Sequence, residues 1–355
     1  MRLIECVPNF SEGQNPEIID AIAQAIATTP CGKEEFVKVL HVDPGQAANR
    51  TVITFAGTPS AVCEAAFQGV RKAAELIDMR NHRGTHPRSG ATDVLPLVPI
   101  SGVTLEECKV MARDLARRMF KELGVPCFCY EAAAFRPERK NLAVCRAGEY
   151  EGLRARIEDP EKRPDFSPDH WTEEAAKSGA SHVGARNFLI AVNFNLASTS
   201  ADVAQEIACD VREKGRKYLV DGKVQKGPDG KPLWIRGSLK GCKAIGWYIE
   251  EYRCAQVSMN ITDLSATSLH QTYETVCEAA RKRGQTVTGT EIIGLVPKSV
   301  LTEAGTYFVH KKTSTDESME VHLSESELIQ TAIEAMHLDD LKPFDPQQKV
   351  IEYLL

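Results

Sequence analysis

The densest polar segment of this 355-residue chain runs from Arg80 to Asp93 and carries two histidines, His82 and His86. Histidine is the side chain best suited to moving protons near neutral pH, so either imidazole could act as a general base and then as a general acid. Arg83 and Arg88 add positive charge between and beside them, which suits a substrate that carries carboxylate groups. The segment therefore predicts proton-transfer chemistry on an anionic small molecule.

Two other interpretations of this segment stay open from the residues alone. Gly84, Pro87 and Gly90 argue against a helix, so the four-residue spacing does not place both imidazoles on one helical face. No glutamate follows His82 as the zinc-protease pattern requires, which disfavours a metal site. A purely structural loop, in which backbone groups satisfy the histidines, is the other alternative.

A second polar segment, from His41 to Thr51, lies between two expected strands. Asp43 closes one strand and Arg50 opens the next, so both side chains could point into one cleft. The alternative is that Asp43 is a turn aspartate that binds its own backbone, which is common. Neither GxGxxG nor GxxxxGK[ST] occurs in the chain, so nicotinamide and ATP chemistry have no sequence support.

Alternating helices and strands must position these segments. Asn15 and Pro16 predict a helix N-terminus, and capping boxes at Thr104 with Glu107 and at Ser324 with Glu327 predict two more. A proline-rich polar crossing, residues 158–181, is the best candidate for a domain boundary, and residues 223–231 predict a hairpin or a mobile loop. Apolar periodicity predicts further helices at about 60–77, 200–214 and 269–280, and strands at 37–42, 51–55, 126–130, 188–196, 244–249 and 255–261.

A weak internal echo suggests that the chain has two related halves. Residues 90–99 resemble residues 289–297, and each stretch follows a strand and an apolar helix. We expect an α/β fold (an α+β sandwich) with two related subdomains, each a β-sheet with helices packed on one face. The expected division is 1–183, 184–335 and a C-terminal tail, 336–355.

Composition narrows the functional class further. The chain is 43% hydrophobic and 26% charged, with a formal net charge of −6, which argues against nucleic-acid or membrane-surface binding. No stretch approaches the roughly 18 apolar residues of a membrane span. The eleven cysteines include no CxxC pair, so we expect reduced thiols packed as small hydrophobic groups. Glu5 stands where a signal peptide would need an apolar run, so we expect a cytoplasmic protein.

Several unusual blocks, in order along essentially the whole chain, resemble the formiminotransferase family, and in particular the N-terminal part of its bifunctional animal members. The resemblance predicts no cyclodeaminase portion. The blocks that carry it are residues 5–13, 43–51 and 82–93, then 146–150, 164–166, 184–186 and 289–297, and the final residues 351–355.

This resemblance implies an activity and its ligands. Family members transfer a formimino group from N-formimino-L-glutamate to N5 of tetrahydrofolate, which yields 5-formiminotetrahydrofolate and L-glutamate in histidine degradation. Tetrahydrofolate is then a co-substrate, and no metal is required. The resemblance also implies a folate groove between the two subdomains and a homodimer, with small-molecule substrates and neither nucleic acid nor membrane as a partner.

The resemblance also assigns residues. His86 is implied as the catalytic base and acid, with Asp43 as its catalytic partner. Substrate binding is implied for Arg50, His82, Arg88 and Asp93. Folate binding is implied for Asp165, Ser167, Pro168, Ser178, Gly179, Gly184 and Arg186.

The sequence departs from animal members at two places. Residues 167–179 are longer and carry Glu173, Glu174 and Lys177 in place of an uncharged run, and residues 223–231 look like an insertion. Two functional alternatives remain: a folate-binding protein without turnover, against which the presence of His86 speaks, and formyl transfer between glutamate and folate.

Overall fold

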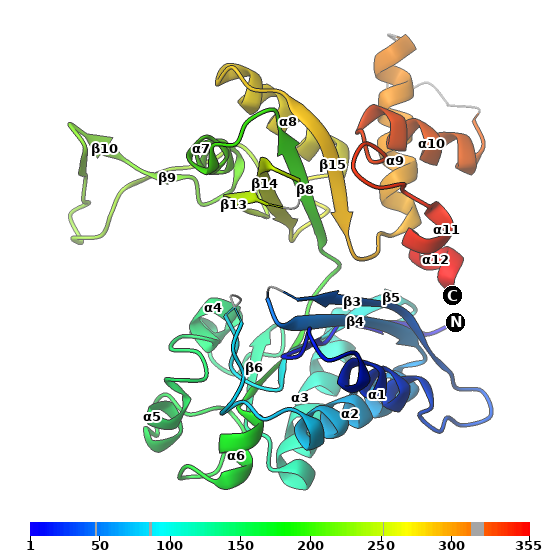
Figure 1. The fold of residues 1–355 in the computed structure, drawn as a ribbon, viewed down its shortest axis with the longest axis vertical. Helices are drawn as coiled ribbons and strands as arrows, with labels where there is room; N and C mark the ends of the chain where they lie inside the picture. Colours follow the sequence, from blue (N-terminus) through cyan, green and yellow to red (C-terminus); the bar gives the residue numbers. More distant parts are fainter. Residues whose placement is uncertain (47, 85–86, 251, 314–322) are drawn as a thin grey trace. The chain divides into compact units, whose positions relative to one another are not determined.

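The computed structural model describes residues 1–46, 48–84, 87–250, 252–313 and 323–355. The chain divides into two compact units, Met1–Asn187 with Leu355, and Phe188–Leu354. Each unit has its own sheet and its own hydrophobic core (Figure 1). Helices and sheets alternate in both, which confirms the expected α/β class. No helix in the part of the chain that the structure describes is both long and apolar enough to cross a membrane.

A seven-stranded sheet forms the centre of the first unit. Its antiparallel part has the order β3-β4-β1/β2-β5, and β7 and β6 extend it in parallel with β5. Because β7 lies between β5 and β6, residues 184–187 belong to this unit, four residues beyond the expected boundary. The strands are β1 (Leu3–Cys6), β2 (Asn9–Phe10), β3 (Val37–Gly45), β4 (Arg50–Gly57), β5 (Thr92–Ser101), β6 (Cys127–Glu131) and β7 (Ser181–Ala185).

Three long helices cover one face of this sheet: α1 (Pro16–Ala27), α2 (Pro59–Leu76) and α3 (Leu105–Leu123). Asn15 caps α1 by accepting a hydrogen bond from the backbone N of Glu17, 3.0 Å away, as its sequence predicted. The predicted capping box of Thr104 and Glu107 opens α3, and Gly124, with a φ of 68°, ends it.

Short helices add a second, smaller core around Phe128 and Tyr130. These helices are η1 (Pro137–Lys140), α4 (Leu142–Cys145), α5 (Leu153–Glu158) and α6 (Glu173–Ser178). Only α6 lies within the proline-rich crossing, residues 158–181. Helices of four to six residues are too short to show an apolar repeat in the sequence.

The second unit repeats the plan of the first. Its strands are β8 (Ile190–Leu196), β13 (Cys242–Ile249), β14 (Cys254–Ile261) and β15 (Val287–Ile293), in the antiparallel order β13-β14-β8-β15. The helices α7 (Ala201–Val211) and α8 (Leu269–Lys282) pack on one face of this sheet. Both units therefore share a β-α-β-β-α-β order, and the two segments of the internal echo fall on the equivalent strands β5 and β15.

Four more helices complete the second core: α9 (Lys298–Thr313), α10 (Glu325–Ala335), α11 (Pro346–Lys349) and α12 (Ile351–Leu354). The predicted capping box of Ser324 and Glu327 opens α10. The expected tail is part of this core, since Met336, Val350 and Ile351 are at most 1% exposed. Between α7 and β13 the chain forms two short ribbons, made of β9 (Arg216–Lys217) with β12 (Trp234–Ile235) and of β10 (Leu219–Val220) with β11 (Lys223–Val224).

Candidate functional site

Asp93, at the start of β5, is the centre of a buried charged cluster in the first unit. Its Oδ2 accepts hydrogen bonds from Nη1 of Arg50 at 2.5 Å and from Nη2 of Arg146 at 2.7 Å. Its Oδ1 accepts the backbone N–H of Ser89 at 2.9 Å, and Nδ1 of His182 donates to its carbonyl oxygen at 2.8 Å. Two guanidinium groups against one carboxylate leave this cluster with an excess of positive charge.

The electrostatics of the cluster keep Asp93 ionised. Burial alone would raise its pKa, but hydrogen bonding from His182 and the charges of Arg50 and Arg146 together hold the pKa of Asp93 well below its usual range. Within the part of the chain that the structure describes, Nε of Arg146 is buried and has no hydrogen-bond partner. A buried, unpaired N–H next to excess positive charge is a suitable donor for an anionic substrate.

His82 and Arg88 form a second cluster that is linked to the first through Ser89. Nε2 of His82 lies 2.9 Å from the carbonyl oxygen of Asn49, and Nδ1 accepts a hydrogen bond from Nε of Arg88 at 3.2 Å. The remaining guanidinium nitrogens of Arg88 bind Glu151 at 2.8 and 2.7 Å. Burial, and then the charge of Arg88, lower the pKa of His82, so its imidazole is neutral with the proton on Nε2.

Ser178 and Gly179, two of the predicted folate-binding residues, contact the backbone of the loop that precedes Asp93. The backbone N of Ala91 donates to the carbonyl oxygen of Ser178 at 2.7 Å, and Gly90 and Gly179 form an isolated bridge. Gly179 has a φ of 65°, and a Cβ there would lie 2.1 Å from the carbonyl oxygen of Ser89. Only glycine fits this position, so Gly179 shapes the backbone beside Asp93.

Asp43 lies on β3, which is an edge strand, and its side chain is exposed. The register pairs Asp43 with Val52 and Gly45 with Arg50. Because alternate residues of a strand share a face, Asp43 and Arg50 project from the same face of the sheet. The structure therefore places Asp43, which is exposed, and Arg50, which is buried, on the same face of the sheet.

The other predicted folate-binding residues lie at the β6 and β7 side of the sheet. Asp165 is buried in an ion pair with Arg139 at 2.5 Å, and its Oδ2 accepts the backbone N–H of Cys129 at 2.8 Å. Ser167 and Pro168 follow it and are half-buried. Gly184 lies against the ring of Tyr130, where a Cβ would come within 2.4 Å of the ring.

Arg186, next along the chain after β7, is close to a buried carboxyl group. Glu5 on β1 is 4% exposed, and burial raises its pKa to about 7 although the charge of Arg186 lowers it. Burial likewise raises the pKa of Tyr130, whose side chain hydrogen-bonds Arg186, to about 12. Glu5 is thus a titratable group near physiological pH that the sequence analysis did not single out as a site residue.

His86 lies outside the described residues, so its role stays a prediction. Arg146 and His182, which reach Asp93 from 53 and 89 positions away, were not predicted as site residues from the sequence. Arg146 does lie in residues 146–150, one of the blocks that carry the family resemblance, and this was the sequence signal that could have identified it as a site residue. Among the described residues there is no group of three or more His, Cys, Asp or Glu side chains placed to hold a metal ion.

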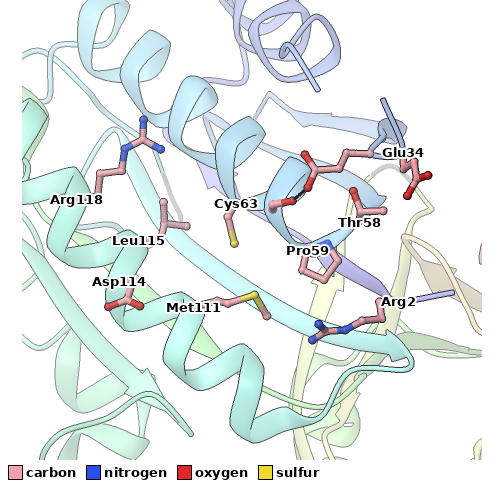
Figure 2. A pocket seen from close by; sticks show the side chains of 11 residues that line it. Arg2, Glu34, Thr58, Pro59, Cys63, Met111, Asp114, Leu115 and Arg118 are labelled. Atoms are coloured by element: carbon pink, nitrogen blue, oxygen red, sulfur yellow. Dashed lines mark hydrogen bonds between the residues drawn. The ribbon is translucent and has the colours of Figure 1, made fainter. Parts of the chain in front are cut away.

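A surface pocket of about 670 Å³ lies elsewhere on the first unit, between α2 and α3 (Figure 2). No described member of the predicted site lines it. Glu64, beside it, pairs with Arg118 at 2.5 Å, and Arg118 also stacks 3.7 Å above the ring of Phe67. Its other lining residues include Arg2, Thr58, Pro59, Cys63, Met111 and Leu115. The pocket is therefore separate from the charged clusters.

Comparisons with known proteins place this geometry in a family. Residues 3–186 match the model of the formiminotransferase domain, N-terminal subdomain, and residues 191–355 match the model of the formiminotransferase domain. These two models define the class of a two-subdomain formiminotransferase fold. The chain belongs to the formiminotransferase family.

Curated relatives agree with this assignment. A glutamate formimidoyltransferase of Streptococcus pyogenes serotype M1 is 39% identical over 311 residues, which are 87% of this chain and 93% of the relative. One of Thermoplasma acidophilum is 38% identical with the same coverage. The formimidoyltransferase-cyclodeaminase of Gallus gallus is 43% identical over 355 residues, all of this chain and 60% of the relative. The chain thus spans about 60% of the length of the bifunctional relatives it matches.

Proposed function

We propose that this chain is a glutamate formimidoyltransferase, which transfers the formimino group of N-formimino-L-glutamate to N5 of tetrahydrofolate as co-substrate. The observation that carries the proposal is the match to the glutamate formimidoyltransferase of Streptococcus pyogenes over 93% of that protein's length. The products are 5-formiminotetrahydrofolate and L-glutamate. We further propose that the enzyme acts in the cytoplasm as a homodimer, on small molecules rather than on nucleic acid or membranes.

The charged cluster around Asp93 supports this choice of substrates. Both formiminoglutamate and the glutamate moiety of folate carry carboxylates, and arginine is the side chain that binds carboxylates in two-point geometry. Arg50 and Arg146 share a single carboxylate, and the buried Nε of Arg146 has no partner among the described residues. A substrate carboxylate would balance the excess positive charge of the cluster.

The reaction needs one group that accepts a proton and returns it. N5 of tetrahydrofolate attacks the formimino carbon, a bond forms between them, and the N5 proton passes to a base. The tetrahedral intermediate then breaks its bond to the glutamate nitrogen, which takes up the proton and leaves as the amine. We propose His86 for this transfer and Asp43 for stabilising the partial positive charge on the formimino carbon.

The hydrogen bonds of His82 support His86, rather than His82, as the group that transfers the proton. Both ring nitrogens of His82 are engaged, Nε2 with Asn49 and Nδ1 with Arg88. An imidazole held in this way has no free lone pair with which to accept the N5 proton. We propose that His82 is a positioning residue that holds the loop, and that Arg88, through Glu151, ties the same loop to residues 146–151.

The predicted folate-binding residues have two kinds of environment. Ser178 and Gly179 contact the backbone of residues 89–91, so we propose that they set the backbone conformation of the loop beside Asp93. Asp165 is paired with Arg139, and we propose that it orients Ser167 and Pro168, which would contact folate. Gly184 and Arg186, beside Tyr130, would contribute to binding of the same ligand.

An assay with two donors tests this function against formyl transfer. The purified chain is incubated with tetrahydrofolate and either N-formimino-L-glutamate or N-formyl-L-glutamate, and the folate product is identified by mass spectrometry. We expect 5-formiminotetrahydrofolate with the first donor and a much lower rate with the second. A higher rate with the formyl donor would assign the sibling activity, and folate binding without either product would make the chain a binding protein.

A further inference from the structure

The second unit carries a projecting arm, residues 216–236, that has no role in the proposed reaction. It consists of the two ribbons β9–β12 and β10–β11 and extends away from the four-stranded sheet (Figure 1). Six of its large apolar side chains are 37–52% exposed: Tyr218, Leu219, Val220, Val224, Leu233 and Ile235. Exposed apolar side chains gathered on one element mark an interaction surface.

The ribbons of the arm are weakly supported by the chain's own fold. The two ribbons are joined to each other by a hydrogen bond from the backbone N of Leu233 to the carbonyl oxygen of Gln225 at 2.8 Å, but within the described residues neither ribbon joins one of the two sheets. A two-stranded ribbon alone is marginally stable in water, because it buries little apolar surface. Its outer backbone groups can also pair with another strand. The arm therefore has both unpaired edges and apolar side chains to offer a partner.

The base of the arm, by contrast, is firmly held. Arg216 forms ion pairs with Glu206 and Asp210 on α7, and Arg283 binds the same Asp210 at 2.6 Å. The ammonium group of Lys214 lies 4.5 Å from the ring centroid of Trp234. These contacts fix where the arm leaves the unit and so present it in a defined direction.

The charge of the arm is opposite to that of the chain as a whole. Its 21 residues hold six cationic and two anionic side chains, net +4, whereas the chain carries −6. Lys223 and Lys226 are exposed, and the structure pairs neither with a carboxylate among the described residues. A negatively charged surface is therefore the complementary partner.

A segment with an excess of exposed carboxylates lies at the other side of the same unit, although Glu325 pairs with Lys298 and Asp340 with His337. Residues 325–355 hold seven carboxylates and two lysines, net −5, and all seven acidic residues are exposed. The arm adjoins β13, which is one edge strand of the sheet, while α9 and α10 follow β15 at the opposite edge (Figure 1). The arm thus lies across the sheet from the acidic segment of its own unit, and a second copy can present that segment to it.

We propose that the arm, residues 216–236, docks on the acidic segment, residues 325–355, of a second copy of this chain. Lysines of the arm would pair with the partner's carboxylates, while the apolar side chains of the ribbons would be covered by its surface. The inference does not depend on the proposed enzymatic activity.

A charge-swap experiment tests the contact by sedimentation equilibrium of the full chain. The arm variant is Lys223→Glu with Lys226→Glu, the acidic-segment variant is Glu334→Lys with Asp340→Lys, and the matched control is Lys33→Glu with Lys121→Glu. We expect the wild type and the control to share one assembly mass, which falls at high salt because these charges are screened. Each swap variant alone should lose at least half of that mass, and an equimolar mixture of the two should regain it.

Four outcomes would overturn the proposal. The first is a wild type with the mass of one chain at every protein and salt concentration. The second is an arm variant that retains the wild-type mass, which would place any association elsewhere. The third is a mixture of the two variants that fails to associate although circular dichroism shows both to be folded. Arm-dependent binding of a labelled single-stranded RNA by a chain that stays monomeric would assign the arm to nucleic acid instead.

Discussion

Nε of Arg88 donates a hydrogen bond to Nδ1 of His82 across 3.2 Å, which fixes His82 as the tautomer that carries its proton on Nε2. That proton in turn reaches the carbonyl oxygen of Asn49. His82 therefore links residues 80–93 to the turn before β4. It adds to the Arg50–Asp93 ion pair, which joins the same two polar segments.

Replacing His82 should destabilise the fold more than it slows the reaction. His82→Ala leaves the carbonyl oxygen of Asn49 and Nε of Arg88 without their partner, at a cost of about 1–3 kcal/mol in the free energy of unfolding. His82→Gln, which retains a donor near the position of Nε2, should recover part of this loss. Urea unfolding of the three proteins measures the difference, and an Ala variant as stable as the wild type would rule out the positioning role.

Asp93→Asn should be among the most destabilising single changes in the first unit. It leaves Arg50 and Arg146 buried against a neutral side chain, and loss of one partner from a buried pair costs about 3–5 kcal/mol. The pKa of Asp93 lies well below its usual range, so the full effect is present at neutral pH. Asp159→Asn, which breaks only an exposed pair with Lys162, is the control and should leave the unfolding midpoint almost unchanged.

Glu5 should make the stability of the fold depend on pH between about 4.5 and 7. Burial raises its pKa to about 7, so the folded state holds a proton that the unfolded state releases near 4.5. This contribution is fully present below pH 4.5 and is lost as the pH rises through 7. Glu5→Gln should remove that dependence and stabilise the protein at pH 8 by about 3 kcal/mol, from 1.36 kcal/mol for each pKa unit.

Chemical denaturation at several pH values provides the comparison for Glu5. The exposed Glu17→Gln is the matched control and should retain the wild-type profile. Equal pH profiles for the wild type and Glu5→Gln would show that Glu5 is ionised in the fold at neutral pH, and the proximity of Arg186 would then outweigh burial.

His86→Ala should lower turnover by about 10²–10⁴, the usual contribution of general acid–base catalysis. Folate affinity should change little, because proton transfer contributes in the transition state rather than in the bound ground state. Steady-state kinetics and folate titration by fluorescence separate the two effects. A dead His82→Ala enzyme together with an active His86→Ala enzyme would reverse the assignment.

Much of the fold follows from local sequence signals. The capping boxes at Thr104 and Ser324 give the true starts of α3 and α10, and apolar periodicity locates α2 and α8. The helix α9 was not predicted, because its residues have no clear apolar stripe. Gly305 lets α9 approach α10 closely, since a Cβ there would lie 2.0 Å from the carbonyl oxygen of Leu328. That contact is tertiary and leaves no local signal.

The site was predictable where its residues share one segment and not where distant strands meet. His82, Arg88 and Asp93 stand out together in the sequence, and Arg50 was expected opposite Asp43. Arg146 and His182 come from separate elements, and only the order of the strands brings His182 on β7 beside Asp93 on β5. Arg146 directly follows α4, which has four residues and is too short to produce an apolar repeat that would reveal it in the sequence.

The central claim is transfer of the formimino carbon to folate, and carbon-13 NMR follows this transfer directly. The purified chain is mixed with tetrahydrofolate and N-formimino-L-glutamate that is labelled with carbon-13 at the formimino carbon. We expect the labelled carbon to appear on N5 of tetrahydrofolate, with one L-glutamate released for each carbon transferred. Label that stays on glutamate, or that leaves as formamide or formate while folate remains unlabelled, would contradict the account.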